Sequence, residues 1–539
     1  MALTIKENQK LSLSQILAVA GGAKVSLSPA TKRRLSIQRQ KLVAQLRQSK
    51  EPAYGFNRGF GHNVEKSVAE KDLELLQLNL VRSHASGVGP EIPTQIVRTA
   101  MLLRAHSLAQ GFSGVRPEVI QCLCDFLNAQ ITPIVPQFGS VGASGDLAPL
   151  AHIALALIGE GAVRDRTGRK YKNSKSLKVK LLQLQMKEGL ALLNGVQVST
   201  AYGLHSIAAC KNLLSQAVLN TALVTQVMLG ADDSFSAEFQ NVRPHSGALK
   251  IAELLRNLCK NSPIREFHRD YRVDGQVQDP YNIRCSPQIL GACYELLEQA
   301  ERTLMIEAQS VTDNPLVFTK KNRNKKTNFK IVSGGHFHGM PVAVQLYSML
   351  EAIGIIARLG NLRCVRFVDE SKNRGLGSGL KWPHLNADES AASSAMMIPE
   401  YVSASLCNHI WGQCMPTHLF ALSTDAGQED HVSMSAGLAV RLWDTLPRLA
   451  EILAIELAYC VQAAEIRASS TQFPGIAGPT PWPKQSRKLS PICEKVHREA
   501  LKFFPPVKKD RVLSEELSNL AEKIISGKFI SVAKFQGKV

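Results

Sequence analysis

Apolar side chains recur three and four positions apart through long stretches of this chain, and this spacing restricts the fold more than any other feature. The stretch TQIVRTAMLLRAHSLAQGF at 94–112 keeps the pattern up to a glycine, which predicts a helix. From 435 to 467, interrupted by Pro447, apolar positions fall on nearly every turn with charged residues between them. Alternating patterns joined by Asn-Gly turns do not dominate. We therefore predict a mainly α fold, an elongated bundle of long helices with a smaller mixed N-terminal region.

Breaks in this pattern divide the chain into three predicted stretches. Residues 1–205 form an N-terminal region, 206–480 a central long-helix bundle and 481–539 a C-terminal helical section. The segment 473–488 contains four prolines and separates the bundle from the last section. FKIVSGGHFHG at 329–339 fits either a strand or a loop.

The formal net charge of +19 raises the question of an anionic partner. The cations lie in two local runs rather than in a stripe, and no aromatic residues are interleaved for base stacking. We therefore interpret both runs as solvated loops or small excursions and expect no nucleic-acid partner. The runs are Arg164, Arg166, Arg169, Lys170, Lys172, Lys175, Lys178 and Lys180, then Lys320, Lys321, Arg323, Lys325, Lys326 and Lys330.

The eleven cysteines include no CxxC pair and no metal-ligand spacing, so we expect no metal site. Cys122 and Cys124 lie in an apolar stretch and are typical of core thiols. The first residues, MALTIKENQK, lack the apolar region of a signal peptide, and no uninterrupted apolar run of membrane-spanning length is present. We expect a cytoplasmic protein without a membrane partner.

The segment FGSVGASGDLAPLAH at 138–152 places glycines and small residues directly before an apolar helical stretch. One interpretation is a tight turn followed by a helix with Asp146 as its N-cap. The other is chemical: the Gly145 nitrogen attacks the Ala143 carbonyl and two waters leave, a reaction that needs small residues with close backbone approach. Its product is a 4-methylidene-imidazol-5-one with an electrophilic methylene from Ser144.

GSVGASGDLAPLAH closely resembles the electrophile-forming segment of the aromatic amino acid ammonia-lyases. Other segments resemble the same family in the same order. They are YGFNRGFG (54–61), SHASGVG (83–89), LLNGVQVST (192–200), VQDPYNIRCSPQ (277–288), TDNPL (312–316), SGGHFHG (333–339) and QEDHVSM (428–434). The resemblance implies the family's helical fold, an electrophile made from Ala143, Ser144 and Gly145 without an external cofactor, and a homotetramer.

The resemblance also implies a role for each matched position. Tyr54 would be the base that takes the β-hydrogen, which requires a lowered phenol pKa. Arg284 and Asn194 would bind the substrate carboxylate, and Gln278 and Tyr281 would line the same pocket. Without the resemblance, Tyr54 is typical of a packing residue and Arg284 of an exposed turn.

The substrate ring is predicted from His84 and Glu429, which match the histidine-selective members. A carboxylate suits a ring with N–H donors and would be poorly solvated against a bare phenyl ring. His84 is less selective, since tyrosine-selective members also present a histidine there. Phe337 would pack beside the reacting centre, although a buried Phe is usually core.

Three positions depart from the family pattern. Arg58 stands where a small Thr is expected, His336 where GGNF is usual, and Gly427 where histidine enzymes commonly have Asn. A long cation in the Tyr54 loop could alter substrate choice or slow turnover.

These residues predict a carbon–nitrogen lyase that releases ammonia and urocanate from L-histidine. Two alternatives keep the electrophile: a phenylalanine or tyrosine ammonia-lyase, and an aromatic 2,3-aminomutase. A third is a catalytically silent basic binding protein, for which Arg58, His336 and the net charge are the motivation.

Overall fold

The computed structural model describes residues 2–49, 52–58, 68–270, 278–321, 327–383, 385–475 and 478–534. Its residues form two compact units. The first unit comprises 1–205, 301–347 and 416–443, and the second comprises 206–300, 348–415 and 444–539. The predicted division into three consecutive stretches stays a prediction.

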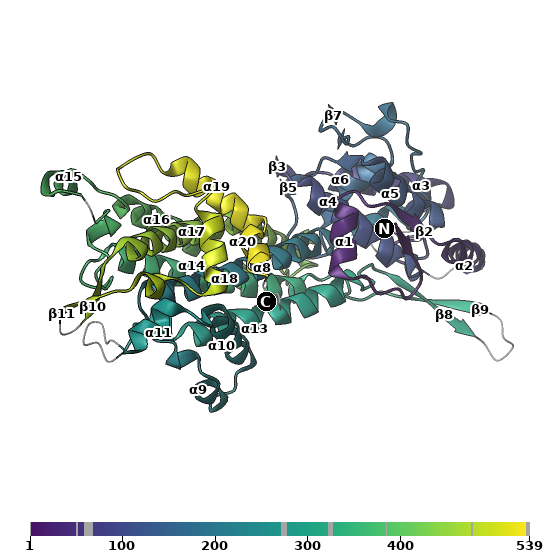
Figure 1. Ribbon diagram of the computed structural model, residues 1–539. Coiled ribbons are helices and arrows are strands. Elements are labelled where there is room, and N and C mark those ends of the chain that lie inside the picture. Colours follow the sequence, from purple (N-terminus) through teal and green to yellow (C-terminus); the bar gives the residue numbers. More distant parts are fainter. Residues whose placement is uncertain are drawn as a thin grey trace. The chain divides into compact units, whose positions relative to one another are not determined.

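Helices dominate both units (Figure 1). Four long helices contribute residues to both units. They are α8 (Gln197–Val227), α13 (Ser286–Ala308), α14 (Met340–Val368) and α17 (Ser435–Ser469). The predicted helix from 435 is continuous through Pro447, although proline removes one backbone donor.

The first unit combines helices with short strands. Its helices are α1 (Leu13–Ala20), α2 (Pro29–Gln48), α3 (Leu73–His84), α4 (Thr94–Ala109), α5 (Pro117–Ala129), α6 (Leu147–Leu157) and α7 (Glu188–Leu193). Its strands are β1 (Leu3–Ile5), β2 (Val25–Leu27), β3 (Val88–Glu91), β4 (Thr132–Pro133), β5 (Pro136–Phe138), β6 (Val163–Arg164), β7 (Lys170–Tyr171), β8 (Leu316–Lys321) and β9 (Thr327–Val332). β1 pairs with β2 in parallel, and the pairs β3–β5, β4–β6, β6–β7 and β8–β9 are antiparallel.

Helix α4 forms the centre of the first unit. It covers most of the predicted 94–112 helix, and every residue from Ile96 to Ala109 is buried. A helix buried on all faces must satisfy its polar side chains internally. Arg98 does so by donating to the carbonyls of Val19, Ala20 and Leu127.

The second unit is almost entirely helical. Its helices are α9 (Ala237–Asn241), α10 (Ser246–Cys259), α11 (Pro263–Asp270), α12 (Tyr281–Arg284), α15 (Ala387–Ala391), α16 (Met397–Gln413), α18 (Pro491–Ala500), α19 (Ser514–Ile525) and α20 (Lys528–Val532). The proline-rich segment after α17 contains the hairpin of β10 (Gln472–Gly475) and β11 (Gly478–Pro481).

Helices α8 and α14 are long and apolar enough to cross a membrane by length and composition alone, with mean hydropathies of 1.2 and 1.5 over 18 residues. The protein buries 78% and 56% of those windows. Packing inside the protein therefore accounts for much of their apolar character.

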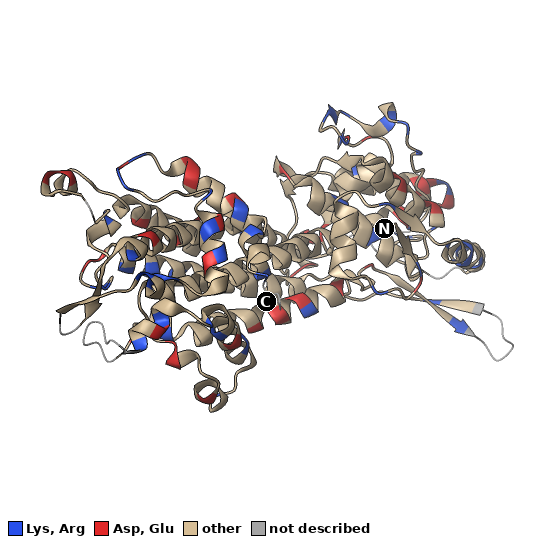
Figure 2. Ribbon diagram, viewed as in Figure 1, with Lys and Arg blue, Asp and Glu red and all other residues tan. Residues whose placement is uncertain are grey.

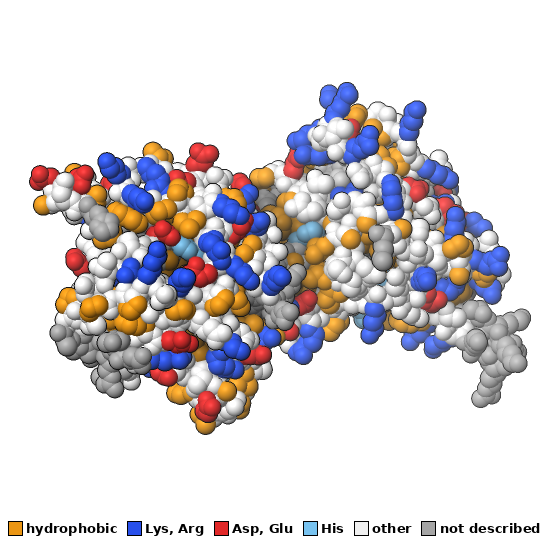
Figure 3. All heavy atoms as spheres, in the orientation of Figure 1, with side chains coloured by type: hydrophobic (Ala, Val, Ile, Leu, Met, Phe, Trp, Pro, Cys, Tyr) orange, Lys and Arg blue, Asp and Glu red, His pale blue; other side chains and the backbone are white. Residues whose placement is uncertain are grey.

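The first basic run lies on β6, β7, the turn between them and the loop after them, where Lys172, Lys175, Lys178 and Lys180 are exposed. Figure 2 marks Lys and Arg along the excursion that carries β7, and Figure 3 shows positively charged side chains on the surface there. Their exposure matches the prediction of a solvated excursion. The second run falls on β8 and β9, and its Arg323, Lys325 and Lys326 lie outside the described residues.

Candidate active site

The small residues between β5 and α6 permit an unusually close backbone approach. Gly145 has φ +79°, and its backbone forms a bridge with Gly195, whose carbonyl accepts a hydrogen bond from Asp146 N at 2.8 Å. A Cβ at Gly145 would overlap the backbone of Gly195. Gly142 has φ +65° and has no room for a Cβ beside Ser433 and Ser435. Glycine therefore occupies both positions because the packing leaves no room for a side chain.

Asp146 anchors this segment from inside the unit. Its carboxylate is fully buried and accepts hydrogen bonds from Ser140 Oγ at 2.9 Å and from Ser199 N and Oγ at 2.8 Å each. Burial raises the pKa of Asp146, and the hydrogen bonds oppose that shift. The bonds connect the glycine-rich segment to the first turn of α8.

Ser144 and Glu429 meet directly although they lie far apart in sequence. The Ser144 hydroxyl donates to Glu429 Oε1 at 2.5 Å, and the Thr424 hydroxyl donates to Glu429 Oε2 at 2.5 Å. Thr424 and Glu429 also pair through their backbones around a tight loop. In that loop Asp425, Ala426 and Gly427 all have positive φ. The Gly427 departure thus falls where glycine is unstrained.

His84 ends helix α3 and belongs to the same neighbourhood. Burial lowers its pKa, while the negative charges of Glu429 and Asp425 act in the opposite direction. The imidazole is therefore mainly neutral at pH 7, so that one ring nitrogen donates and the other accepts. Ser83 Oγ lies 3.1 Å from its Nδ1.

Asn194 directly precedes Gly195 and is only 3% exposed. Its side-chain Nδ2 donates to the Asn314 carbonyl at 3.4 Å, and its own carbonyl accepts from Arg104 Nη1. Burial lowers the pKa of Arg104 to about 10, and Asp313 opposes the shift. Asn194 is therefore held from both its backbone and its side chain.

The segment that carries Phe337 is tied to two parts of the site. Asn314 Oδ1 accepts from Gly334 N at 2.8 Å, and Gly339 N donates to the Gly142 carbonyl at 3.2 Å. Phe337 is half-buried between these attachments, and His336 is exposed. The exposed His336 explains how a departure at this position leaves the packing intact.

Tyr54 lies half-buried in a short turn. The turn is closed by Asn57 Oδ1, which accepts from Ala53 N at 2.7 Å, and is anchored by the buried Phe56. Phe56 belongs to a core cluster with Leu42, Ala53, Val317 and Phe329. Residues 59–61 of the predicted loop motif lie outside the described residues.

Gln278, Tyr281 and Arg284 belong to the second unit, at and before α12. Arg284 donates to Gln278 Oε1 at 2.7 Å and to the Asp279 carbonyl at 2.8 Å, and its guanidinium lies 4.7 Å from the centre of the Tyr281 ring. Tyr281 is 69% exposed. The structure therefore gathers these three residues in one unit and the other predicted site residues in the other.

Sequence reasoning missed Thr424 and Lys187, and it gave no role to Asp313 although this residue lies in the matched segment TDNPL. Thr424 precedes the QED motif by four positions, and its contact depends on the tight loop between them. Lys187 is a lysine with 0% exposure that pairs with the equally buried Asp313. A single cation before the apolar run EGLALL was the available signal, but a lysine in sequence is usually solvated.

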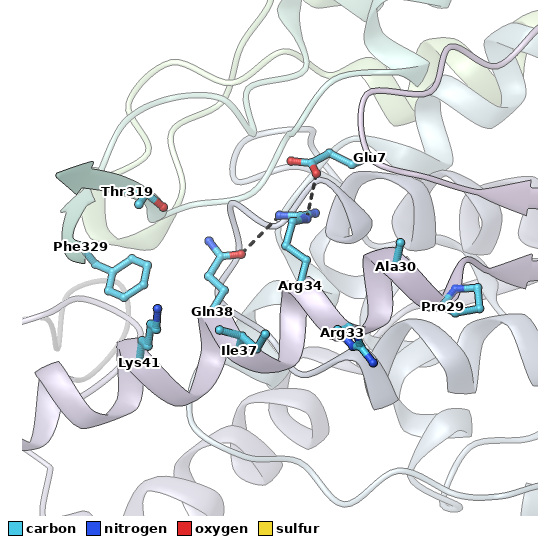
Figure 4. Close-up of a pocket in the computed structure, with 10 residues that line it drawn as sticks. All are labelled: Glu7, Pro29, Ala30, Arg33, Arg34, Ile37, Gln38, Lys41, Thr319 and Phe329. Carbon is cyan, nitrogen blue, oxygen red and sulfur yellow. Dashed lines mark hydrogen bonds and ion pairs between the residues drawn. The ribbon is translucent and has the colours of Figure 1, made fainter. Parts of the chain in front are cut away.

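Other features of the described residues do not coincide with this site. No group of three or more His, Cys, Asp or Glu side chains in the described part of the chain is arranged to hold a metal ion. A cavity of about 880 Å³ lies along α2, β8 and β9, where Arg34 contacts Glu7 and Gln38 (Figure 4). No predicted site residue lines that cavity.

Comparison with known proteins places the chain in a family. A family model described as aromatic amino acid lyase matches residues 11–498. A histidine ammonia-lyase from Enterobacter sp. (strain 638) is 36% identical over 487 residues, which is 89% of each chain.

Two solved structures have the same fold over nearly the whole chain. Histidine ammonia-lyase from Trypanosoma cruzi superposes with a TM-score of 0.84 at 28% identity, covering 99% of this chain and 95% of that one. Tyrosine aminomutase from Streptomyces globisporus gives a TM-score of 0.86 at 27% identity, covering 100% and 99%.

The fold and the matched motifs define a carbon–nitrogen lyase. The chain belongs to the aromatic amino acid lyase family. This membership confirms the predicted family, the mainly α fold and the enzyme class.

Proposed function

We propose that the protein eliminates ammonia from L-histidine to give trans-urocanate. The observation that carries this proposal is the 2.5 Å contact between Ser144 and Glu429, with His84 in the same neighbourhood. It puts a carboxylate acceptor at the residue that would become electrophilic. A ring with N–H donors can pair with that carboxylate, whereas a phenyl ring would desolvate it without compensation. The histidine ammonia-lyase relatives support the same substrate.

The chain would make its electrophile from Ala143, Ser144 and Gly145. The residues fit a 4-methylidene-imidazol-5-one because Gly142 and Gly145 leave no room for side chains and the backbone is already tightly turned. Asp146 and Ser433 would hold the segment in place. When formed, the group supplies an electrophilic carbon that makes the substrate amine a better leaving group.

The remaining residues would bind the substrate and move its proton. Tyr54 would take the β-hydrogen as a proton while the C–N bond breaks and the double bond forms, so ammonia and urocanate account for all atoms. Asn194 and Arg284 would bind the carboxylate, and Gln278 would line the same pocket. Tyr281 would line the pocket, and Phe337 would pack beside the ring. His84 and Glu429 would bind the imidazole.

We propose a cytoplasmic homotetramer, in which each active site draws residues from more than one chain, as in the family. Activity should then fall when the protein is diluted below the concentration at which it assembles. Full activity in a proven monomer would contradict this part of the proposal.

The deciding experiment incubates the purified protein separately with L-histidine, L-phenylalanine and L-tyrosine, and follows the ultraviolet absorption of each unsaturated acid. We expect urocanate to form most rapidly. Cinnamate or coumarate without urocanate would overturn the substrate assignment. Intact mass should show the loss of two waters, about 36 Da, as required for this covalent catalysis. Ser144→Ala should retain the full mass and lose nearly all activity.

An aminomutase is the second candidate, because the similar Streptomyces globisporus structure is a tyrosine aminomutase. That reaction moves the amine to the β-carbon instead of releasing it. Chromatography of the products separates the two outcomes, since a β-amino acid would favour the aminomutase.

A further inference from the structure

Lys187 and Asp313 form an ion pair that solvent does not reach. Both side chains are 0% exposed, and Lys187 Nζ lies 2.9 Å from each carboxylate oxygen of Asp313. The third ammonium hydrogen goes to the Asn314 carbonyl at 3.0 Å. All three donors of the lysine are used, so its side chain has one well-defined position.

The stem of Lys187 packs against the turn that carries Tyr54. A Cβ added at Gly55 would lie 3.2 Å from Lys187 Cδ and 2.8 Å from Leu190 Cδ2. The backbone of Gly55 therefore rests directly on these side chains, with φ +74°. Lys187 itself has φ +74°, an uncommon conformation for a residue with a side chain.

Asn314 extends the ion pair to two other site segments. Its carbonyl accepts from both Lys187 and Asn194, and its side-chain oxygen accepts from Gly334 N and Ser333 Oγ. Its own backbone N–H donates to Asp313 at 2.7 Å. A displacement of the Lys187–Asp313 pair would therefore shift both Asn194 and the segment that carries Phe337.

The charges around the pair indicate that it is not a simple neutral unit. Asp313 also faces Arg104, whose buried guanidinium holds the Asn194 carbonyl. Two buried cations thus share one carboxylate. Burial lowers the pKa of Lys187, while Asp313 opposes this shift and Arg104 adds to it.

We propose that the Lys187–Asp313 pair is a positioning element of the reaction, which sets the Tyr54 turn, Asn194 and the 333–339 segment in one mutual arrangement. This inference rests on the proposed function, in which those segments supply the base, a carboxylate ligand and the ring contact. Errors of about 1 Å in such placements can reduce turnover about 100-fold.

The test replaces Lys187 by methionine, which keeps an unbranched stem against Gly55 and leaves Asp313 facing Arg104. The matched control is Arg98→Met, which removes another buried cation of the first unit; its three hydrogen bonds go to Val19, Ala20 and Leu127, outside the site. Each protein is assayed for intact mass, thermal midpoint, kcat, KM and the isotope effect with β-deuterated histidine.

We expect Lys187→Met to form the electrophile and to lose about 10- to 100-fold in kcat, with a larger isotope effect because the base is misplaced. Arg98→Met should lower the thermal midpoint but keep kcat and the isotope effect within about twofold of wild type, as expected for a purely structural cation. A loss of active protein alone would lower kcat without changing the isotope effect.

Wild-type kcat and isotope effect in folded Lys187→Met would overturn the inference, as would equal losses in Arg98→Met. If Lys187→Met does not fold, Asp313→Asn decides, because it removes the charge that pairs with Lys187 while keeping the size of the side chain. Unchanged kcat and isotope effect in that variant would overturn the inference.

The wild-type protein tests the proposed function separately. Activity on phenylalanine or tyrosine but not on histidine overturns only the substrate assignment, and the variants are then compared on that substrate, β-deuterated. A wild type inactive on all three amino acids overturns both proposals.

Discussion

Thr424→Val isolates the hydrogen bond that orients Glu429. Valine replaces the hydroxyl by a methyl group of similar size, so the 2.5 Å bond to Glu429 Oε2 disappears while the backbone pairing remains. A hydrogen bond to an ionised group contributes about 1.5–3 kcal/mol. Because both residues are only half-buried, water compensates part of the loss and the lower figure applies. Since about 1.4 kcal/mol is a factor of ten, we expect kcat/KM for histidine to fall about tenfold.

The assay is the initial rate of urocanate formation at several histidine concentrations. Ser423→Ala is the matched control, since it removes the exposed hydroxyl of the neighbouring residue. Intact mass should show that Thr424→Val still loses two waters. A kcat/KM within twofold of wild type would refute the reasoning that Thr424 orients Glu429, the carboxylate proposed to bind the ring.

Three further perturbations follow from the buried geometry. Gly145→Ala should keep its full intact mass and lose activity, because its Cβ would overlap Gly195; a variant that still loses two waters would contradict this. Burial lowers the pKa of His106 from 6.5 to about 4, so the unfolded chain binds its proton first and stability falls as the pH drops through this window. Protonation of His106 alone should lower the free energy of unfolding by roughly 2 kcal/mol between pH 7 and pH 5. Denaturant titration of His106→Gln should show a smaller loss over the same pH range. Arg116→Met leaves the fully buried Glu188 carboxylate without its cation and should cost about 3 kcal/mol in the same titration; a loss below about 1 kcal/mol would argue that water compensates Glu188.

Local sequence patterns were enough to predict the helices, whereas the reactive segment was predicted from its resemblance to the family. Helical periodicity identified the stretch that forms α4 because a buried helix must repeat apolar positions on each turn. At Gly145 the structure supplies the physical reason for the glycine, because a Cβ there would overlap the backbone of Gly195. Helical periodicity is encoded in a short stretch, so α4 could be predicted without knowledge of distant partners, whereas the contact of Gly145 with Gly195 could not.

Contacts between distant residues could not be predicted in the same way. Lys187 and Asp313 are 126 positions apart, and nothing in either local sequence indicates that they form an ion pair in the core. The β8–β9 hairpin was not predicted either: 329–339 was left open between strand and loop, and the cations from Lys320 to Lys330 were interpreted as a solvated loop or small excursion, although Lys320, Lys321 and Lys330 lie on the strands. The two strands pair in register from Leu316 opposite Val332 to Lys321 opposite Thr327. Neither strand indicates this pairing by its own sequence.

The Glu429 carboxylate beside Ser144 has a hydrogen-bond donor before the electrophile forms and loses that donor afterwards, at the two stages of the proposed reaction. Before the electrophile forms, one Glu429 carboxylate oxygen accepts a hydrogen bond from the Ser144 hydroxyl, and the other accepts one from the Thr424 hydroxyl. Once Ser144 has lost its hydroxyl, that acceptor site is released and must find another donor or stay solvated. An imidazole N–H can supply the donor, whereas phenylalanine offers none. Formation of the electrophile would therefore itself create the selectivity for the ring. Glu429→Gln should lower the ratio of kcat/KM for histidine to kcat/KM for phenylalanine by a larger factor than it lowers kcat/KM for phenylalanine itself.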